Sequence, residues 1–261
     1  MNQKIATIFG GSGFIGSRLI RKLTEKDYRL IIATRSPYLN GFLKSFGDIG
    51  QIELVKINIY NHEDIKNILR KSDIAINLVG ALYEKKNQKF KYLHSEFPNF
   101  LSKICHELKL EKLVHISALG AKEGHTSKYM QSKFQGEKNI QNNFKPSVIL
   151  RPSVVFGPSD KFFETFASIA QFSPFLPLIG GGKTKFAPIY VGDVAKAIVK
   201  SLELTNSETI IYELGGENYS FKELMKILLV EIKKKRLLIP IHFGIAKFQS
   251  YFLQMMPTPL L

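Results

Sequence analysis

The sequence predicts an α/β protein with a doubly wound parallel sheet and a small C-terminal lobe. Short β-branched runs alternate with amphipathic helical stretches over residues 1–150, a pattern typical of βαβ units. The expected strands are almost continuously apolar, as in Ile74–Val79, which is typical of parallel strands buried on both faces. A run from Lys4 to Phe9 leads directly into a glycine-rich turn and then into a helical pattern.

The individual elements are placed by the spacing of the apolar residues, which recur about every 2 residues in strands and about every 3.6 residues in helices. The expected strands are 4–9, 29–34, 52–57, 73–79, 112–117 and 146–151. The expected helices between them are 14–26, 37–46, 61–70, 95–109 and 126–143. Later we expect a helix over 190–204, a strand over 210–214 and a helix that begins with a capping box at Ser220 and Glu223 and runs to Lys235.

The composition changes after Arg151, where prolines and phenylalanines become frequent and the strand–helix repeat stops. We therefore expect one domain over 1–154 and a partial lobe over 155–261, with elements of the lobe returning to the first sheet. Residues 239–261 are apolar and aromatic to the end. From this apolar end we expect the sequence to be a shortened form of a longer chain.

The formal net charge of +15 has two interpretations. It reflects a lysine-rich composition, or it indicates an anionic partner such as a membrane surface or an acidic protein. The basic residues are scattered and no nucleic-acid-binding module is recognisable, so we expect no nucleic-acid partner. No apolar run reaches about 18 residues, which predicts no transmembrane segment.

Cysteine and histidine usage narrows the class of protein further. The single cysteine, Cys105, and a first strand that leaves no room for a signal peptide predict a cytoplasmic protein. Peripheral attachment to the inner face of the membrane is the alternative. The histidines show no metal-ligand spacing with acids or with Cys105, so we expect no metal site.

The glycine-rich turn after the first strand carries the strongest functional signal in the sequence. Gly10 allows a tight turn, Gly13 allows a pyrophosphate to approach the backbone, and Gly16 allows the helix to pack closely on the strand. The pyrophosphate would face the free N–H groups at the start of that helix. A glycine turn can serve chain reversal alone, but its place between a strand and a helix favours dinucleotide binding. The loop residues expected to contact the cofactor are Gly10, Ser12, Gly13, Phe14, Ile15 and Gly16.

Arg35 follows the second strand, where dinucleotide-binding folds place the residue that meets the adenosine ribose. A carboxylate there favours NAD(H), whereas an arginine suits the 2′-phosphate of NADP(H). The stretch Ala33–Ser36 contains no acid. We therefore expect NADP(H) to be preferred over NAD(H), with an ordinary surface arginine as the alternative.

Tyr129 and Lys133 are four residues apart on an expected helix, so they share one face. We expect the lysine ammonium to lower the pKa of the tyrosine, which otherwise titrates at about 10. Such a tyrosine can exchange a proton with a hydroxyl or carbonyl while a hydride moves to or from a nicotinamide. The spacing alone is unspecific in a lysine-rich chain, so its weight comes from its place after the fifth strand.

The glycine turn, Tyr129–Lys133 and Leu150–Pro158 together resemble the extended short-chain dehydrogenase/reductase family. Further segments resemble an atypical branch of that family, typified by the NDUFA9-like accessory subunit of respiratory complex I. These segments are Asn77–Glu84, Val114–Ala121, Leu176–Gly182 and Pro188–Ala195. The resemblance covers nearly the whole chain.

The resemblance implies a Rossmann fold that binds NADP(H), with Tyr129 as the acid/base and Lys133 also bonding the nicotinamide ribose. A serine that polarises a substrate carbonyl would fall at Ser117 or just beyond it, where Ala118 and Leu119 follow instead. Ser117 is therefore either this serine or a strand-end serine bonded to the backbone. The other cofactor contacts that the resemblance implies are Asn58 and Ile59 near the adenine, Val79 and Gly80 on the path to the nicotinamide, and Pro152 and Val155 over the nicotinamide.

Two functions remain open from the sequence. In the first, the protein holds NADP(H) as a structural cofactor and is an accessory or assembly component of complex I, the NADH:ubiquinone oxidoreductase. In the second, it is an active NADP-dependent oxidoreductase or epimerase on a sugar, steroid-like or quinone-pathway substrate. The basic charge and the apolar tail favour the first function. The Tyr129/Lys133 pair favours the second.

Overall fold

The computed structural model describes residues 3–85 and 88–241 of the 261-residue chain. The chain forms two compact units, each assembled from separate segments. The first unit joins Met1–Pro152 to Val191–Leu214, and the second joins Ser153–Tyr190 to Gly215–Leu261. Residues 242–261, which include most of the apolar tail, lie outside the described residues.

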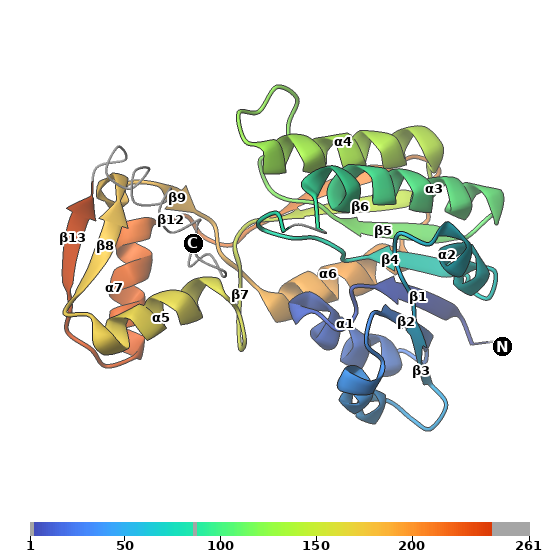
Figure 1. The fold of residues 1–261 in the computed structure, drawn as a ribbon, viewed down its shortest axis with the longest axis horizontal. Helices are drawn as coiled ribbons and strands as arrows, with labels where there is room; N and C mark the ends of the chain where they lie inside the picture. Colours follow the sequence, from blue (N-terminus) through green and yellow to red (C-terminus); the bar gives the residue numbers. More distant parts are fainter. Residues whose placement is uncertain (1–2, 86–87, 242–261) are drawn as a thin grey trace. The chain divides into compact units, whose positions relative to one another are not determined.

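The first unit is built around a seven-stranded sheet with the order β11-β6-β5-β4-β1-β2-β3 (Figure 1). All neighbouring pairs are parallel. This order confirms the predicted α/β class and is that of a doubly wound dinucleotide-binding sheet. The strands are β1 (Ile5–Phe9), β2 (Arg29–Thr34), β3 (Ile52–Lys56), β4 (Ile74–Asn77), β5 (Lys112–Ile116), β6 (Ser147–Pro152) and β11 (Ile210–Leu214).

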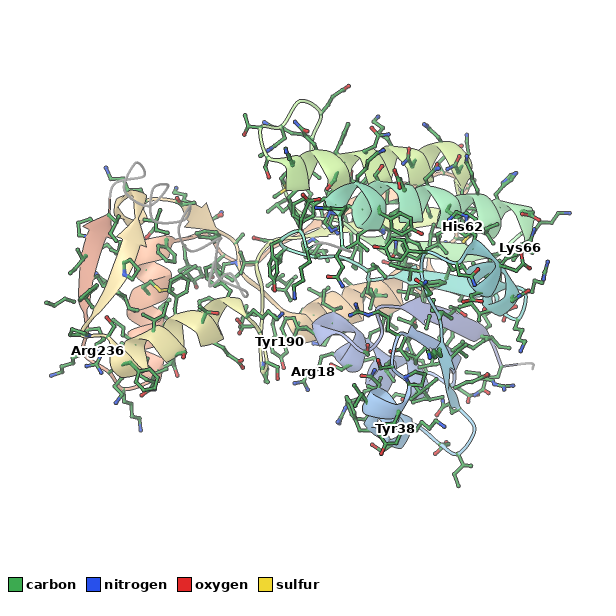
Figure 2. The ribbon with its side chains drawn as sticks, in the orientation of Figure 1. Arg18, Tyr38, His62, Lys66, Tyr190 and Arg236 are labelled. Atoms are coloured by element: carbon green, nitrogen blue, oxygen red, sulfur yellow. The ribbon has the colours of Figure 1, made fainter. Side chains whose placement is uncertain are left out.

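Helices cover both faces of this sheet, because its strands are apolar on both sides. One face carries α1 (Phe14–Thr24) and α6 (Val191–Glu203), and the other carries α2 (His62–Leu69), α3 (Phe97–Glu107) and α4 (Lys128–Asn143) (Figure 1). Two side chains of α2 that are labelled in Figure 2 attach it to α3. The His62 ring stacks on Phe100 with centroids 3.8 Å apart, and Lys66 Nζ pairs with Glu107 at 2.5 Å.

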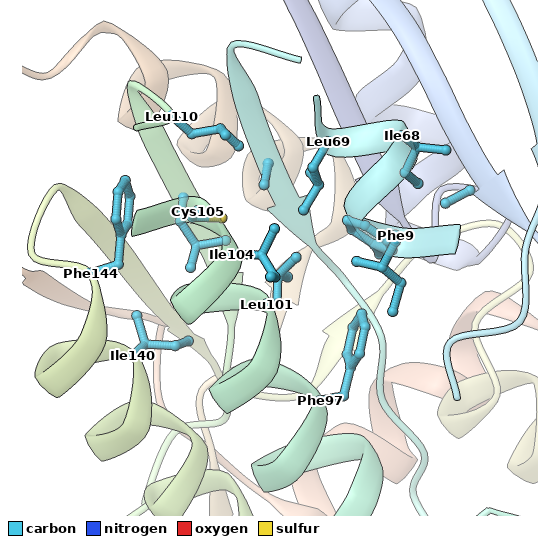
Figure 3. Packing of buried hydrophobic residues seen from close by; sticks show 14 of the residues in the cluster. Phe9, Ile68, Leu69, Phe97, Leu101, Ile104, Cys105, Leu110, Ile140 and Phe144 are labelled. Atoms are coloured by element: carbon cyan, nitrogen blue, oxygen red, sulfur yellow. The ribbon is translucent and has the colours of Figure 1, made fainter. Parts of the chain in front are cut away.

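One core cluster of the first unit lies between the sheet and the α2–α3–α4 layer (Figure 3). Phe9 of β1 meets Phe97 of α3 edge to face, with ring centroids 5.5 Å apart. Such a pair contributes about 1 kcal/mol beyond the area that it buries. The cluster holds β1 and β4 against α3, and so fixes the positions of the loops that leave the carboxyl ends of these strands.

Three expected helices differ in the structure. Residues 38–46 form a 3-10 helix, η1 (Tyr38–Phe46), and near its start the Asn40 side chain donates to Thr34 Oγ1 and to the Ser36 carbonyl. The helix expected from residue 95 begins earlier, as a π-helix, η2 (Lys91–Glu96), which continues into α3. The helix after Ser220 has the predicted capping box but is shorter, α7 (Phe221–Glu231). It ends before Lys233, which has a left-handed φ of 53°.

Among its described residues, the second unit contains two α-helices, a short 3-10 helix, η3 (Gly180–Gly182), and three two-stranded sheets. Phe166 of α5 (Phe162–Phe172) packs with Met225 and Leu228 of α7 in a core of its own. The paired strands are β7 (Val155–Phe156) with β10 (Ile189–Tyr190), β8 (Phe175–Ile179) with β13 (Leu237–Ile241), and β9 (Lys185–Phe186) with β12 (Tyr219–Ser220). The strand β13 was not expected, because it begins just after the helix predicted to run to Lys235 and continues into the apolar tail.

Candidate functional site

The candidate site begins where the strand order reverses, between β1 and β4. In open α/β sheets, ligands bind outside the carboxyl ends of the strands at this point. Gly10, directly after β1, has a φ of +80°, and a Cβ there would lie 3.0 Å from the backbone carbonyl carbon of Leu78. Only glycine therefore lets the loop after β1 lie this close to the loop after β4.

Gly16 allows α1 to pack on the same loop. A Cβ at Gly16 would lie 2.3 Å from the carbonyl oxygen of Gly11 and 2.5 Å from its Cα. These are backbone atoms that no rotamer change can move. Gly16 therefore allows a close approach of α1, to the loop after β1 rather than to the strand itself.

The start of α1 fits a bound phosphate group. Its N-cap residue is Gly13, which has no side chain to cover the first N–H groups of the helix, and the first turn contains no acidic residue. Ser12 and Gly13 are exposed, Phe14 and Ile15 are half-buried. An anion at this position would meet both free N–H groups and the positive end of the helix dipole.

The residues expected at the adenosine lie at the ends of β2 and β3, next to the glycine loop in the sheet. Arg35 is exposed and comes directly after β2. Asn58 is exposed, and its Oδ1 accepts from the Tyr60 N–H at 3.1 Å. Ile59 is half-buried, and its carbonyl accepts from the Tyr92 hydroxyl. The sheet order thus brings Arg35, Asn58 and Ile59 to the carboxyl ends of neighbouring strands, and their contacts with an adenosine stay a prediction.

Val79 and Gly80 follow β4 and lie beside the helix that carries the Tyr/Lys pair. The Val79 N–H donates to Asn77 Oδ1 at 3.0 Å, which shapes the start of this loop. A Cβ at Gly80 would lie 3.3 Å from Lys133 Nζ. The structure therefore brings Gly80 and Lys133 together, although they are far apart in the sequence.

Tyr129 and Lys133 both belong to α4, and burial determines their electrostatics. Burial raises the pKa of Tyr129 to about 12, and it lowers the pKa of Lys133 to about 8 against the opposing charge of Glu137. Our expectation that the ammonium lowers the tyrosine pKa is wrong, because burial disfavours the phenolate and raises that pKa instead. Lys133 Nζ lies 6.0 Å from the centre of the Tyr129 ring and donates to the Ile116 carbonyl at 3.1 Å.

Ser117 belongs to a row of buried polar side chains at the ends of β4 and β5. Asn77 and His115 are paired across these strands, and Ser117 lies two residues beyond His115 on the same side. The Asn77 Nδ2, both His115 ring nitrogens and the Ser117 Oγ are buried without a hydrogen-bond partner in the described part of the chain. Burial, followed by the charge of Lys133, lowers the pKa of His115 well below its usual value. Ordered water or polar ligand groups satisfy such buried atoms.

The Ser117 backbone is bonded, while its hydroxyl is not. The Ser117 N–H donates to the Leu150 carbonyl at 2.8 Å. The alternative in which the hydroxyl itself bonds the backbone is therefore wrong among the described residues. Pro152, at the end of β6, is buried, and its carbonyl accepts from the Leu119 N–H. Val155 lies in β7 of the second unit, so its place over a nicotinamide stays a prediction.

Two features of the site were missed in the sequence. His94 in η2 is fully buried and bonds to the Ala81 N–H and to Ser132. Glu137, one turn after Lys133, is buried and receives a two-pronged bond from Arg151 at 2.6 and 2.9 Å. Only the four-residue spacing of Lys133 and Glu137 was visible in the sequence. Nothing in the sequence connects His94 with its partners.

Within residues 3–85 and 88–241, no group of three or more His, Cys, Asp or Glu side chains could hold a metal ion. In the same part of the chain, no helix has the length and apolarity that crossing a membrane requires.

Curated relatives of known name match most of this chain. Mitochondrial NADH dehydrogenase (ubiquinone) 1 alpha subcomplex subunit 9 of Arabidopsis thaliana is 31% identical over 98% of this chain and 66% of its own length. The Mus musculus protein of the same name is 31% identical over 86% of this chain and 60% of its own length. This chain therefore spans about three fifths to two thirds of the length of these relatives.

Comparison with solved structures identifies the fold of this chain, and comparison with family models identifies its family. UDP-glucuronic acid 4-epimerase from Bacillus cereus, in complex with UDP-glucuronic acid and NAD, is similar with a TM-score of 0.77. It is 24% identical, and the likeness covers 97% of this chain and 94% of that one, which shows a shared fold. The model of the NAD dependent epimerase/dehydratase family matches residues 6–215. Because this match includes the glycine loop, Tyr129 and Lys133, the chain belongs to the NAD dependent epimerase/dehydratase family.

Proposed function

We propose that this protein holds NADP(H) as a structural cofactor and is an accessory or assembly component of a NADH:ubiquinone oxidoreductase. The observation that carries the proposal is the similarity to mitochondrial NADH dehydrogenase subunits, which extends over 98% of this chain in one relative. Its partners are then the dinucleotide and neighbouring subunits of the complex. The net charge of +15 supports a peripheral position on the inner face of an anionic membrane.

The preference for NADP(H) is supported at the end of β2. Arg35 is exposed there, and Ala33–Ser36 contains no carboxylate that would accept from a ribose 2′-hydroxyl. A guanidinium can bind a 2′-phosphate with two parallel hydrogen bonds. The cofactor supplies hydride chemistry when it is bound, and the residues of this chain bind and orient it.

A structural cofactor is supported by the surroundings of Tyr129 and Ser117. Burial raises the pKa of Tyr129 to about 12, so the phenol stays protonated near neutral pH. The Ser117 hydroxyl is buried, and Ala118 and Leu119 after it carry no hydroxyl. Oxidation of a substrate hydroxyl needs a base that takes up its proton, and a phenol that stays protonated is a poor base.

A second function, an active NADP-dependent oxidoreductase or epimerase, is favoured by one specific observation. Tyr129 and Lys133 lie on one face of α4, with Gly80 beside the lysine. A tyrosine in this place could exchange a proton with a sugar, steroid-like or quinone-pathway substrate.

Purification of the natural protein from its own membranes separates the two functions. The proposal expects it to migrate with the NADH:ubiquinone oxidoreductase on native gels, and to release NADPH only when it is denatured. It also expects no oxidation of that NADPH by a panel of carbonyl compounds. Turnover that Tyr129→Phe abolishes, in a protein that travels apart from the complex, would establish the second function instead.

A further inference from the structure

His94 in η2 is fully buried, and both of its ring nitrogens have partners. Nε2 accepts a hydrogen bond from the Ala81 backbone N–H at 3.1 Å, and Nδ1 lies 3.0 Å from the Ser132 Oγ. A backbone amide can only donate, so Nε2 carries no proton and the neutral ring holds its proton on Nδ1. Nδ1 therefore donates to the Ser132 hydroxyl.

The Ser132 hydroxyl accepts from His94 Nδ1 and in turn donates to the Tyr129 carbonyl at 2.7 Å. A one-way chain of hydrogen bonds thus runs from Ala81 through His94 and Ser132 to Tyr129. It joins the loop after β4, η2 and α4, which are distant in the sequence. Burial, followed by the charge of Lys133, lowers the pKa of His94 to about 3, which keeps the ring neutral and the direction fixed.

Packing holds the His94 ring in place. The Phe90 ring stacks on it with centroids 5.2 Å apart, and the Tyr129 ring meets it edge-on at 5.2 Å. Gly136 lets η2 lie directly on α4, because a Cβ there would lie 1.9 Å from the His94 carbonyl oxygen. Neither the ring nor its backbone can shift without breaking these contacts.

We propose that His94 is a positioning residue that fixes the loop after β4 against the face of α4 carrying Tyr129 and Lys133, and so holds the nicotinamide half of the dinucleotide. Gly80, the residue before Ala81, has its Cβ position 3.3 Å from Lys133 Nζ and 3.6 Å from His94 Nε2. The inference rests on the proposed NADP(H) binding. The hydrogen-bond chain does not extend to Arg35, so the adenosine half is held separately.

Two ligands separate a positioning role from a purely structural one. NADPH contains both halves of the dinucleotide, and 2′,5′-ADP contains only the adenosine half with its 2′-phosphate. In the 261-residue chain, we expect His94→Phe to raise the Kd for NADPH about 10- to 100-fold, because the Ala81 N–H loses its acceptor. The Kd for 2′,5′-ADP, measured by the same calorimetric titration, should change less than about threefold.

Two further variants test the direction of the chain. His94→Gln can offer an oxygen near the place of Nε2, so we expect it to restore the NADPH affinity to within about fivefold of the wild type. Ser132→Ala removes the partner of Nδ1 and should weaken NADPH binding about 2- to 5-fold. Equal losses for NADPH and 2′,5′-ADP in His94→Phe, or no loss of NADPH affinity, would overturn the proposal.

A measurement on the wild-type chain keeps the proposal testable where His94→Phe does not fold. With ¹⁵N-labelled histidine, the NMR signals of His94 should show the Nδ1–H tautomer, unchanged between about pH 5 and 9. An Nε2–H tautomer, or titration in this range, would overturn the hydrogen-bond chain. A wild-type chain that binds neither NADPH nor 2′,5′-ADP would instead overturn the proposed function, and the tautomer would then decide the His94 contacts alone.

Discussion

The two sides of the candidate dinucleotide site are built in different ways. The side at β1 and β2 consists of backbone and exposed groups: the glycine loop, the open start of α1, and Arg35. The side at β4 and β5 consists of buried polar side chains, among them His94 and Lys133. Binding a phosphate requires only local chain geometry, whereas setting the protonation state of a Tyr/Lys pair requires a folded interior that removes water.

The largest effect is expected on the backbone side, from Gly16→Ala. The new Cβ would lie 2.3 Å from the Gly11 carbonyl oxygen, so we expect a loss of about 4 kcal/mol in the free energy of unfolding. Urea denaturation measures it. Gly41→Ala is the matched control, because nothing lies within 4 Å of its Cβ position, and its effect should stay within about 1 kcal/mol. Equal stability of the two variants would show that the close approach is unnecessary.

The next-largest effect is expected on the buried side, where the contribution of Lys133 to the free energy of unfolding depends on pH. Lys133 has a folded pKa of about 8, below its ordinary value of 10.5, so the unfolded chain binds more protons between these values. The stability of the wild type relative to Lys133→Met should therefore rise by about 3 kcal/mol as the pH rises from about 8 to 10.5. Denaturation of both proteins across this range measures the difference.

Comparing the wild type with Lys133→Met isolates the contribution of the lysine to the pH dependence of stability. Burial raises the pKa values of Tyr129 and Cys105, and these groups are present in both proteins, so their own pH dependence cancels. A stability difference that does not change between pH 8 and 10.5 would contradict a desolvated Lys133.

A smaller effect is expected from Arg35→Ala, on binding rather than on stability. The guanidinium is expected to pair with the 2′-phosphate, so the Kd for NADPH should rise about 10- to 30-fold while the Kd for NADH changes less than about twofold. Calorimetric titration with both nucleotides measures this. Lys44→Ala, which removes another exposed cation nearby in the sequence, should leave both affinities unchanged. Equal losses for NADPH and NADH would remove the basis for a preference.

The smallest effect is expected from Tyr129→Phe. The Tyr129 ring packs edge-on against Phe90 and His94, and phenylalanine keeps both contacts. We expect the free energy of unfolding to change by less than about 0.5 kcal/mol. A loss greater than about 1.5 kcal/mol in thermal or urea unfolding would show that the phenol belongs to the buried polar network.

The fold of the first unit could be predicted because its signals are local. Apolar runs mark the strands, and the glycine turn marks the switch between β1 and α1. The strand β13 could not be predicted, because Leu237–Ile241 becomes a strand only by pairing with Phe175–Ile179. Its stability comes from a distant partner rather than from its own period, and Pro240 within it argues against a strand.

The residues of the candidate site also divide into those that local sequence signals could predict and those that depend on the fold. Arg35 and the glycines could be placed by counting from the first strand, and Tyr129 and Lys133 by their spacing on a helix. The raised pKa of Tyr129 could not be predicted from the sequence, because it depends on how much of α4 is buried. His94 was missed because its partners Ala81 and Ser132 are 13 and 38 residues away, and only the fold brings them together.

The arrangement of segments in the first unit has a consequence for its synthesis. β6 pairs with β5 on one side and with β11 on the other, and α6 packs on α1. Residues 153–190 of the second unit come between β6 and α6 in the chain. Because a nascent chain emerges N-terminus first, β6 stays an open sheet edge until Leu214 has left the ribosome. Translation therefore exposes an aggregation-prone edge for as long as it takes to make residues 153–214.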